Sequence, residues 1–451
     1  MDADAEPLLT PAYGPIPKDR FYLVYFIFCL LGLGSLCPWN FFITASEYFK
    51  YKLRNTTMSE GMDYLNPEYQ TDLQTKFESY ITVASTIPNL LVSFLTALLI
   101  KRISLKARMY SSIIMTILLF SLTLVLTKVN TDTWQTGFFV LTIICVIIVS
   151  ASSSVLGASM FGLASLFPSR YVQACMSGQA VGGIFAAVAN IVALAVGSNV
   201  IQSGMGFFLA ATLTAVVTLM AYILLYHLEF SKYHIFDIGR SLDDNVNHRD
   251  ELVLSTRYGC TYYYRILKLI WVEGLCVCLV FFVTLSVFPS IASAIVTTET
   301  GAEAWSEKYF SALVCFLLYN AGDLGGRCVS GYLQVPKFGK RCCLFMLSAL
   351  RVGFIPLLML CNAQPRHLPV LFTHDAYPVV FILLLGLTNG FLSTLAMMYG
   401  PNTLKGMKVK KFKARKAPPD MAESTGAIMS VCLTIGLVTG SLFSLLLVQS
   451  L

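Results

Sequence analysis

The chain has 451 residues, of which 56% are apolar and 13% are charged, and its formal net charge is +7 at pH 7. A soluble globular protein has roughly 25% charged residues, so this chain has too few charges to cover a surface that faces water. The composition excludes a soluble globular fold and predicts a polytopic membrane protein that contacts the lipid bilayer.

Eleven segments are apolar enough, and close enough to about 20 residues, to cross a bilayer as helices. These are the ranges 22–45, 79–100, 109–127, 137–166, 172–197, 205–227, 269–294, 309–333, 342–361, 377–400 and 423–449. The sequence therefore predicts an all-α protein. We expect a cytosolic tail (1–20), a bundle of six helices (21–227), a cytosolic linker (228–268) and a bundle of five helices (269–451).

The distribution of Lys and Arg predicts the orientation in the membrane. With a cytosolic N-terminus, 23 of the 32 basic residues fall on the cytosolic side and 7 on the other, as the positive-inside rule requires. The C-terminus is then extracellular or luminal. The glycosylation sequon that starts at Asn55 lies in an external loop in this orientation, so we expect a glycan on Asn55.

No metal site, cofactor or enzymatic activity is expected. Most of the 13 cysteines lie in apolar segments, and no two of them share an external loop, which argues against zinc and against structural disulfides. The chain lacks the nucleotide-binding motif G-x-x-x-x-G-K-[ST] and the hydrolase motifs H-E-x-x-H and G-x-S-x-G. Transport would therefore be driven by the gradient of the solute or of a coupled ion.

The eighth expected helix carries four residues on one face. Asp323 and Arg327 are four residues apart, and Asn320 and Phe316 continue the same stripe towards the N-terminus. Charged side chains in a membrane helix are costly and mostly face the bundle interior. We expect this face to bind a polar, ring-shaped solute, and a buried ion pair that only fixes helix packing is the alternative.

Other polar or kinking positions are weaker candidates, because solute contact and hydrogen bonding between helices explain them equally well. They are Pro38 and Asn40 in the first helix, Thr86 and Asn89 beside Pro88, Ser177 and Gln179 in the fifth helix, and Asn389 in the tenth. We expect Asn40 to tie a proline bend to a neighbouring helix. Arg351 is expected at the cytosolic start of the ninth helix, as an interface or gate residue.

Two cytosolic segments suggest partners. Asp4, Leu8 and Leu9 have the spacing of an acidic dileucine signal, which clathrin adaptors recognise, so we expect a late endosomal or lysosomal membrane, with the plasma membrane as the alternative. The basic run 405–416 is a loop that follows the positive-inside rule or a contact for anionic lipid. Binding of nucleic acid is not expected from so short a loop.

Seven motifs, in chain order, resemble those of the equilibrative nucleoside transporters. They are GLGSLCPWNFFITASEYF, FGLASLFP with MSGQAVGGIFAAVA, FFVTLSVFPSI, YNAGDLGGR, RVGFIPLLMLCN, LTNGFLSTLAMMYGP and AESTGAIMSVCLTIGLVTG. The resemblance implies a major-facilitator-like arrangement of six plus five helices, a central nucleoside site and transport by alternating access. The first motif is also similar to that of the lysosomal branch.

The resemblance implies a set of residues in contact with the nucleoside. By position in the motifs they are Leu36, Trp39, Thr86, Asn89, Phe281, Phe316, Asn320, Asp323, Arg327 and Leu437. Among them, Trp39 corresponds to an aromatic wall, and Asp323 and Arg327 correspond to the pair that contacts the sugar. Where some relatives carry a glutamine that faces the base, this chain has Gly157, so its base preference is not predicted.

Three functions remain open from the sequence. The first is a facilitative nucleoside carrier whose flux responds to pH. The second is a carrier of organic cations or monoamines, which needs a further acid in the cavity, and Glu273 is the candidate for it. The third is a receptor or scaffold in which the Asp323–Arg327 pair is structural.

Overall fold

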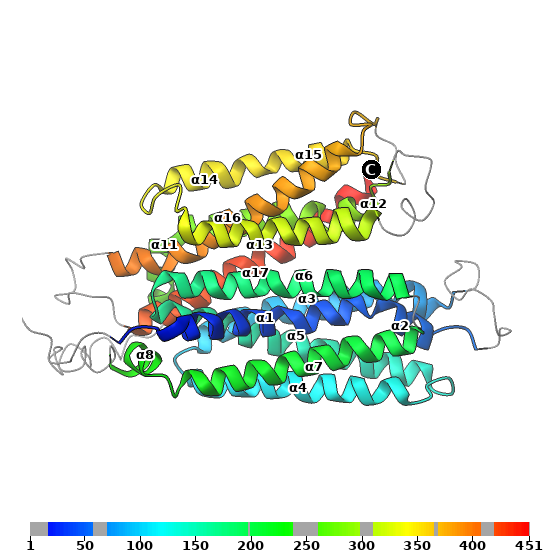
Figure 1. Cartoon of the computed structure of the whole chain (residues 1–451), viewed down its shortest axis with the longest axis horizontal. Coiled ribbons are helices and arrows are strands. Elements are labelled where there is room, and N and C mark those ends of the chain that lie inside the picture. The colour runs from blue at the N-terminus through cyan, green and yellow to red at the C-terminus, as the bar shows by residue number, and fades with distance from the viewer. Residues whose placement is uncertain are drawn as a thin grey trace, which may run out of the picture.

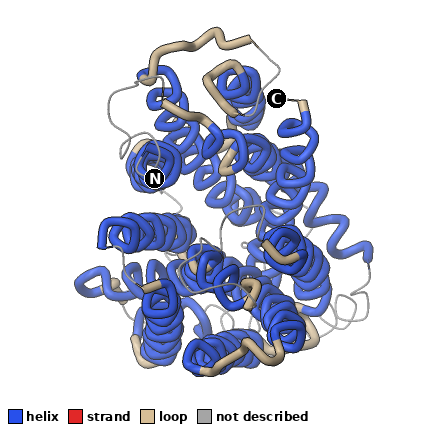
Figure 2. The backbone as a smooth tube through the Cα atoms, turned by 90° about the vertical axis from the view of Figure 1, so that its right-hand side faces the viewer, coloured by secondary structure: helices blue, strands red, loops and turns tan. Residues whose placement is uncertain are grey.

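The structure, a computed structural model, describes residues 17–56, 70–196, 199–237, 260–297, 310–364, 369–406 and 419–450. These residues form helices joined by turns and short loops, with no β-strand in the described ranges (Figure 2). The expected sorting signal at Asp4, Leu8 and Leu9, and most of the basic run 405–416, lie outside the described residues.

The helices form two bundles that lie side by side (Figure 1). The N-terminal bundle contains α1 (Leu23–Thr44), α2 (Ser46–Lys52), α3 (Asp72–Leu99), α4 (Leu105–Lys128), α5 (Gln135–Leu166), α6 (Ser169–Val196) and α7 (Val200–Leu225). The C-terminal bundle contains α11 (Cys260–Val287), α12 (Ser290–Ala294), η4 (Ser311–Leu317), α13 (Leu318–Tyr332), α14 (Arg341–Leu350), η5 (Arg351–Gly353), α15 (Phe354–Met359), α16 (Ala376–Gly406) and α17 (Pro419–Gln449). Two short helices, α8 (Glu229–Lys232) and η2 (Tyr233–Asp237), follow α7.

Ten helices of the described residues are long and apolar enough to span a membrane, and each coincides with an expected span. The remaining expected span, 309–333, is the π-helix η4 running directly into α13. Its length is divided between two helix types, and it carries both Asp323 and Arg327. The total of eleven spans and their orientation remain predictions.

Helices α3 and α11 begin furthest ahead of the expected spans. Helix α3 starts at Asp72, because Thr71 and Gln74 form a capping box in which each side chain accepts a hydrogen bond from the other's backbone N–H. Helix α11 starts at Cys260, within the expected linker. Apolar runs mark only the part of a helix that faces lipid, so they miss polar turns that extend beyond it.

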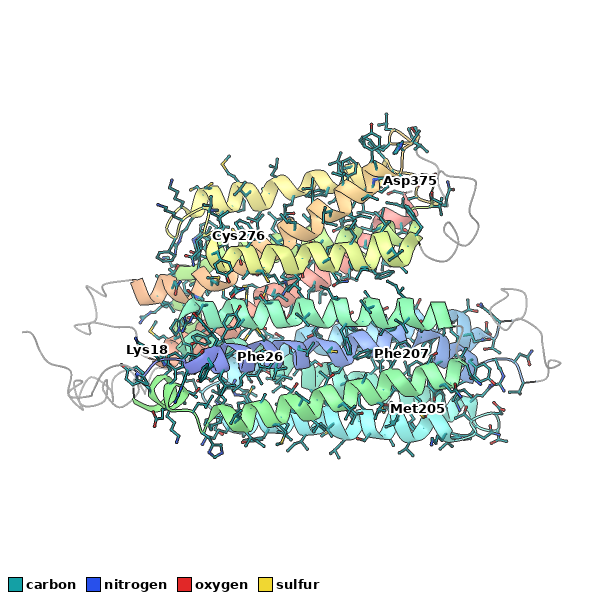
Figure 3. All side chains as sticks on the ribbon, viewed as in Figure 1. Lys18, Phe26, Met205, Phe207, Cys276 and Asp375 are labelled. Carbon is teal, nitrogen blue, oxygen red and sulfur yellow. The ribbon has the colours of Figure 1, made fainter. Side chains whose placement is uncertain are left out.

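Successive long helices run in opposite directions, so the connections gather at two ends of the molecule. Figure 3 labels Lys18 at one end and Asp375 at the other, and we call these the Lys18 end and the Asp375 end. Arg108 and Arg341 lie at the Lys18 end, where α4 and α14 begin. The outer surface between the ends exposes large apolar side chains, such as Met220 at 62%, as expected for contact with lipid.

Helices α13 and α16 pack closely because glycines of each face the backbone of the other. A Cβ atom at Gly326 would overlap the carbonyl oxygen of Leu387, and a Cβ atom at Gly390 would overlap that of Asp323. Small residues allow close approach of helices in a membrane, where apolar burial does not drive association. This packing brings Asp323 on α13 next to Asn389 on α16.

Gly326→Ala should lower stability by about 1–3 kcal/mol, because the added methyl group overpacks the α13–α16 contact. Gly325→Ala is the matched control, since a Cβ at this neighbouring position has no heavy atom within 4 Å. The control should be neutral or slightly stabilising, because alanine favours a helix over glycine. Thermal unfolding of the two purified variants in detergent measures the difference, and equal midpoints would contradict the packing argument.

Candidate functional site

A cavity of about 800 Å³ lies between the two bundles. This volume is within the range of about 300–1,000 Å³ that small-molecule sites occupy. Helices α1, α3, α5, α6 and α7 line it on the N-terminal side, and α11, α13, α16 and α17 line it on the C-terminal side. Both bundles therefore contribute to one site, as a carrier that moves its halves against each other requires.

All the residues expected to contact the solute line this cavity. They are Leu36, Trp39, Thr86, Asn89, Phe281, Phe316, Asn320, Asp323, Arg327 and Leu437. Of the residues expected to have structural or gating roles, Asn40, Gln179 and Asn389 also line it. Pro38 and Arg351 do not. The residues that line the cavity come from distant parts of the sequence, so the fold, and not local spacing, brings them together.

The charged centre of the cavity is the carboxylate of Asp323, which is 3% exposed. Arg327 Nε lies 2.8 Å from Asp323 Oδ2 as an ion pair, although its N–H is not aligned for a hydrogen bond. Asn389 Nδ2 donates to Asp323 Oδ1 at 2.7 Å. Arg327 also donates through Nη1 to the carbonyl oxygen of Met176 on α6, at 2.5 Å, so the pair connects the two bundles.

A second arginine supports this centre from behind. Thr284 Oγ1 donates to Asn389 Oδ1 at 2.8 Å, and Arg351 Nη2 donates to Thr284 Oγ1 at 2.9 Å. Arg351 also donates to the carbonyl oxygens of Val280 and Leu385. The chain Arg351–Thr284–Asn389–Asp323 therefore orients the carboxylate, since each member fixes the next one.

The expected place of Arg351 was wrong. The ninth span begins at Arg341 in α14, and Arg351 lies in the short helix η5 within that span, where it is 2% exposed. An arginine in an apolar segment suggests a helix end, but here carbonyl and hydroxyl oxygens satisfy the guanidinium inside the bundle.

Two further positions show what sequence reasoning missed. Asn320 Nδ2 donates to Phe316 O at 2.8 Å, and a Cβ at Gly183 of α6 would overlap Asn320 Oδ1, so this glycine makes room for the amide. The small residues around Gly183 predicted a close helix contact, but they did not indicate that Asn320 would be the residue in contact. We expected the Asn40 side chain to hydrogen-bond a neighbouring helix, but it forms no hydrogen bond with a described residue. Its backbone carbonyl oxygen accepts a hydrogen bond from the hydroxyl of Thr44 in the same helix.

The charged pair and the hydroxyl-rich part of the lining lie on different helices. Asp323 and Arg327 belong to the C-terminal bundle, whereas the lining residues of α3 and α5 are neutral and rich in hydroxyl groups. These are Thr82, Ser85, Thr86, Asn89, Ser150 and Ser153. Aromatic faces complete the cavity, with Trp39 stacked parallel to Phe42 at 6.2 Å between ring centroids.

The cavity extends towards the Asp375 end and is closed at the Lys18 end. Its lining reaches Glu47 on α2 and Ser203 on α7. At the Lys18 end, Arg108 of α4 forms an ion pair with Glu423 of α17, which joins the two bundles. Gln173 of α6 adds a hydrogen bond to the carbonyl oxygen of Arg327, at 3.1 Å.

Glu273 lies outside this cavity. Its carboxylate is 2% exposed and lies 2.8 Å from Arg341 Nε, with Thr403 as a further partner. It is not among the residues that line the main cavity. Glu273, the acid that was the candidate for an organic-cation carrier, is therefore absent from the described lining, and the other acid there besides Asp323 is Glu47, on α2 towards the Asp375 end.

Residues 141–449 match a family model described as nucleoside transporter. The chain belongs to the nucleoside transporter family. Equilibrative nucleoside transporter 3 of Rattus norvegicus is 39% identical, over 98% of this chain and 92% of its own length. Equilibrative nucleoside transporter 1 of Homo sapiens is 32% identical, over 95% of this chain and 98% of its own length. The expected family is thereby confirmed, and the chain is a transporter and not an enzyme.

Two solved structures confirm the major-facilitator fold. The proton:xylose symporter XylE, bound to 6-bromo-6-deoxy-D-glucose, aligns with a TM-score of 0.61 at 14% identity, over 93% of this chain and 87% of its own. FucP, in the outward conformation, aligns with a TM-score of 0.55 at 12% identity, over 95% and 97%. At such low identity the likeness concerns the fold alone.

Glu423→Gln should weaken the closure at the Lys18 end, because Arg108 would lose its charged partner. A charge-assisted hydrogen bond at a partly exposed site contributes about 1–2 kcal/mol, so the rate of amide exchange in the first turns of α4 and α17 should rise about tenfold. Hydrogen–deuterium exchange of the purified protein measures this. Asp132→Asn, which removes the Arg54–Asp132 ion pair at the other end, is the control. Equal uptake in both variants would show that Arg108 and Glu423 do not hold this end closed.

Proposed function

We propose that this protein is a facilitative nucleoside carrier that binds the ribose at Asp323 and works by alternating access of its two bundles. The observation that carries the proposal is the buried centre of Asp323, Arg327 and Asn389 in a cavity shared by both bundles. Membership of the nucleoside transporter family, and similarity to relatives named equilibrative nucleoside transporters, support the substrate class.

The chemistry of the cavity suits a nucleoside. A carboxylate has about four acceptor positions, and Asn389 and Arg327 use only some of those on Asp323, so vicinal ribose hydroxyls can donate to the others. Trp39 and Phe316 offer flat apolar faces for a planar base. A carrier must also release its solute, so we expect micromolar to millimolar affinity, about −8 to −4 kcal/mol.

The geometry supports alternating access. The cavity extends to the Asp375 end, while the Arg108–Glu423 pair closes the Lys18 end. If Lys18 is cytosolic, as the charge distribution predicts, this conformation faces the outside or the lumen. Rocking of the bundles would break Arg108 from Glu423 and open the cytosolic side. Because the sequence lacks a nucleotide-binding motif that could couple transport to ATP hydrolysis, the net flux follows the concentration gradient of the nucleoside.

The alternatives from the sequence find no support. An organic-cation carrier was expected to place Glu273 in the cavity, and Glu273 is bound to Arg341 elsewhere. A receptor or scaffold with a purely structural Asp323–Arg327 pair would not need the pair to face a cavity of about 800 Å³. The nucleoside carrier accounts for both observations.

The compartment and the minor partners are further parts of the proposal. The membrane is that of late endosomes or lysosomes, with the acidic dileucine at Leu8 and Leu9 recognised by clathrin adaptors. Anionic lipid contacts the basic run 405–416, and a glycan is attached to Asn55, which is exposed after α2.

Asp323→Ala should abolish nucleoside flux, and Asp323→Asn should reduce it at least about tenfold, because the amide keeps the shape but loses charge-assisted bonds to ribose. Counterflow of labelled adenosine into proteoliposomes measures the flux. Glu273→Gln, which alters a buried carboxylate of the same bundle outside the cavity, is the matched control and should transport normally. Normal flux through folded Asp323→Ala would refute the site.

Replacement of Leu8 and Leu9 by alanine should move the full-length protein to the plasma membrane of a mammalian cell, because a dileucine signal needs both apolar side chains. Surface biotinylation and imaging measure the shift, and several-fold more protein at the surface is expected. Lys18→Ala, in the same tail, is the control. An unchanged endolysosomal distribution would show that the sorting signal lies in another segment of the chain.

A further inference from the structure

Gln179 on α6 carries a side-chain amide with one bonded end and one free end. Its Nε2 donates to Ser35 Oγ of α1 at 3.2 Å, and Ser35 Oγ itself donates to the carbonyl oxygen of Gly32 at 2.8 Å. Because the hydroxyl proton of Ser35 is already used, its oxygen can only accept a hydrogen bond from Gln179. The amide nitrogen must therefore point to Ser35. The amide oxygen, Oε1, is the end without a partner among the described residues.

The amide oxygen of Gln179 is open to the cavity. The residue is half-buried and lines the cavity, and its oxygen is not among the unbonded side-chain atoms that the described residues enclose. Lipid does not account for this opening, because the exposed apolar residues of α6 lie on the other side of the helix. These are Val181, Phe185, Val188 and Val192. Gln179 thus presents a hydrogen-bond acceptor to a solute.

Two contacts fix the register of α6 against α13. Arg327 of α13 donates to the carbonyl oxygen of Met176 on α6. Nearer the Asp375 end, Gly183 of α6 makes room for the side chain of Asn320 on α13. The contacts lie seven residues apart on each helix, so α6 and α13 run antiparallel and in step between them.

This register places Gln179 at the same depth as Asp323. Each residue lies about halfway between the two contacts of its own helix, and both line the cavity. Gln179 is also the first residue of α6 in the described lining, and α6 begins at the Lys18 end, where Tyr171 donates to Asp19. The closed end of the cavity therefore holds two acceptors from different bundles, the amide oxygen of Gln179 and the carboxylate of Asp323.

We propose that Gln179 is a specificity-determining residue whose amide oxygen accepts a hydrogen bond from a ribose hydroxyl. The inference rests on the proposed nucleoside function and adds a sugar contact from the N-terminal bundle to that of Asp323. The hydroxyls at 2′, 3′ and 5′ are the donors of the sugar, and one carboxylate does not need all of them. The bond to Ser35 holds the amide in place before the solute arrives, which reduces the entropy lost on binding.

The test compares the affinities of wild-type protein and Gln179→Met for nucleosides that lack single groups. Methionine is an unbranched side chain of similar length that has no amide. Full-length protein in proteoliposomes takes up labelled adenosine, and unlabelled nucleosides compete. The competitors are adenosine, its 2′-, 3′- and 5′-deoxy analogues, and purine riboside, which lacks the amino group of the base. The affinity for each analogue is expressed as a ratio to that for adenosine.

Gln173→Met is the matched control, because Gln173 is a second amide on α6 that reaches α13 but does not line the cavity. A variant that only shifts the balance between carrier conformations changes all affinities by one factor, which cancels in a ratio. The ratios therefore report contacts with the solute. Thermal stabilisation of the purified protein by each nucleoside gives the same ratios for a variant that binds without transporting.

Wild-type protein should bind adenosine more tightly than its deoxy analogues. In Gln179→Met, at least one of the deoxy ratios should move about 3- to 10-fold towards one, as expected for the loss of one hydrogen bond. The ratio for purine riboside should be unchanged, because the base does not contact Gln179. Gln173→Met should keep all the ratios of the wild-type protein.

Three results would overturn the inference. Unchanged deoxy ratios in Gln179→Met would show that Gln179 does not bind the ribose. A change only in the ratio for purine riboside would assign Gln179 to the base. Equal changes in Gln173→Met would show an indirect effect of the contact between α6 and α13. Absence of adenosine uptake by wild-type protein would instead refute the proposed function itself, so the two failures are distinguished.

Discussion

The need to stabilise one carboxylate within a membrane shapes the C-terminal bundle. Asp323 is almost fully buried, and a charge in that position requires partners from several directions. Arg327 supplies the opposite charge, and Asn389 supplies a hydrogen bond from another helix. Glycines at the α13–α16 contact make that approach possible, and Arg351 fixes the amide through Thr284. The binding centre thus depends on packing that can be traced through three more helices.

The two bundles contribute different chemistry to the same cavity. The C-terminal bundle presents a charged centre held by a continuous network, which suits a constant part of the solute. Helices α1, α3 and α5 of the N-terminal bundle present neutral hydroxyls and the aromatic face of Trp39, which suit a part that varies from one solute to the next. In this arrangement the charged centre supplies affinity, and the hydroxyls allow solutes with different polar groups to bind. A rigid ion pair fits few arrangements of donors, whereas a hydroxyl can rotate and can either donate or accept.

Local patterns predicted more of the site than of its connections. The stripe of Phe316, Asn320, Asp323 and Arg327 follows from helical spacing, and motif resemblance predicted the residues on the other helices that the cavity brings together. The Arg108–Glu423 pair could not be predicted, because 315 positions separate its members and each appears as an ordinary charge near a helix start. Arg351 was misplaced for a related reason, since its partners are two backbone carbonyl oxygens and two threonine hydroxyls of other helices, which no sequence pattern displays.

The bond from Arg327 to the carbonyl oxygen of Met176 has a consequence for the return of the empty carrier. Separation of α13 from α6 at the Lys18 end removes this acceptor, and the guanidinium then has a donor without a partner in a buried place. A bound solute with a suitable acceptor can take over the donor, whereas the vacant carrier has only water to offer it. The free-energy barrier to reorientation should therefore be lower for the carrier with bound solute than for the empty carrier. Exchange of one solute molecule for another across the membrane should then be faster than net transport in one direction.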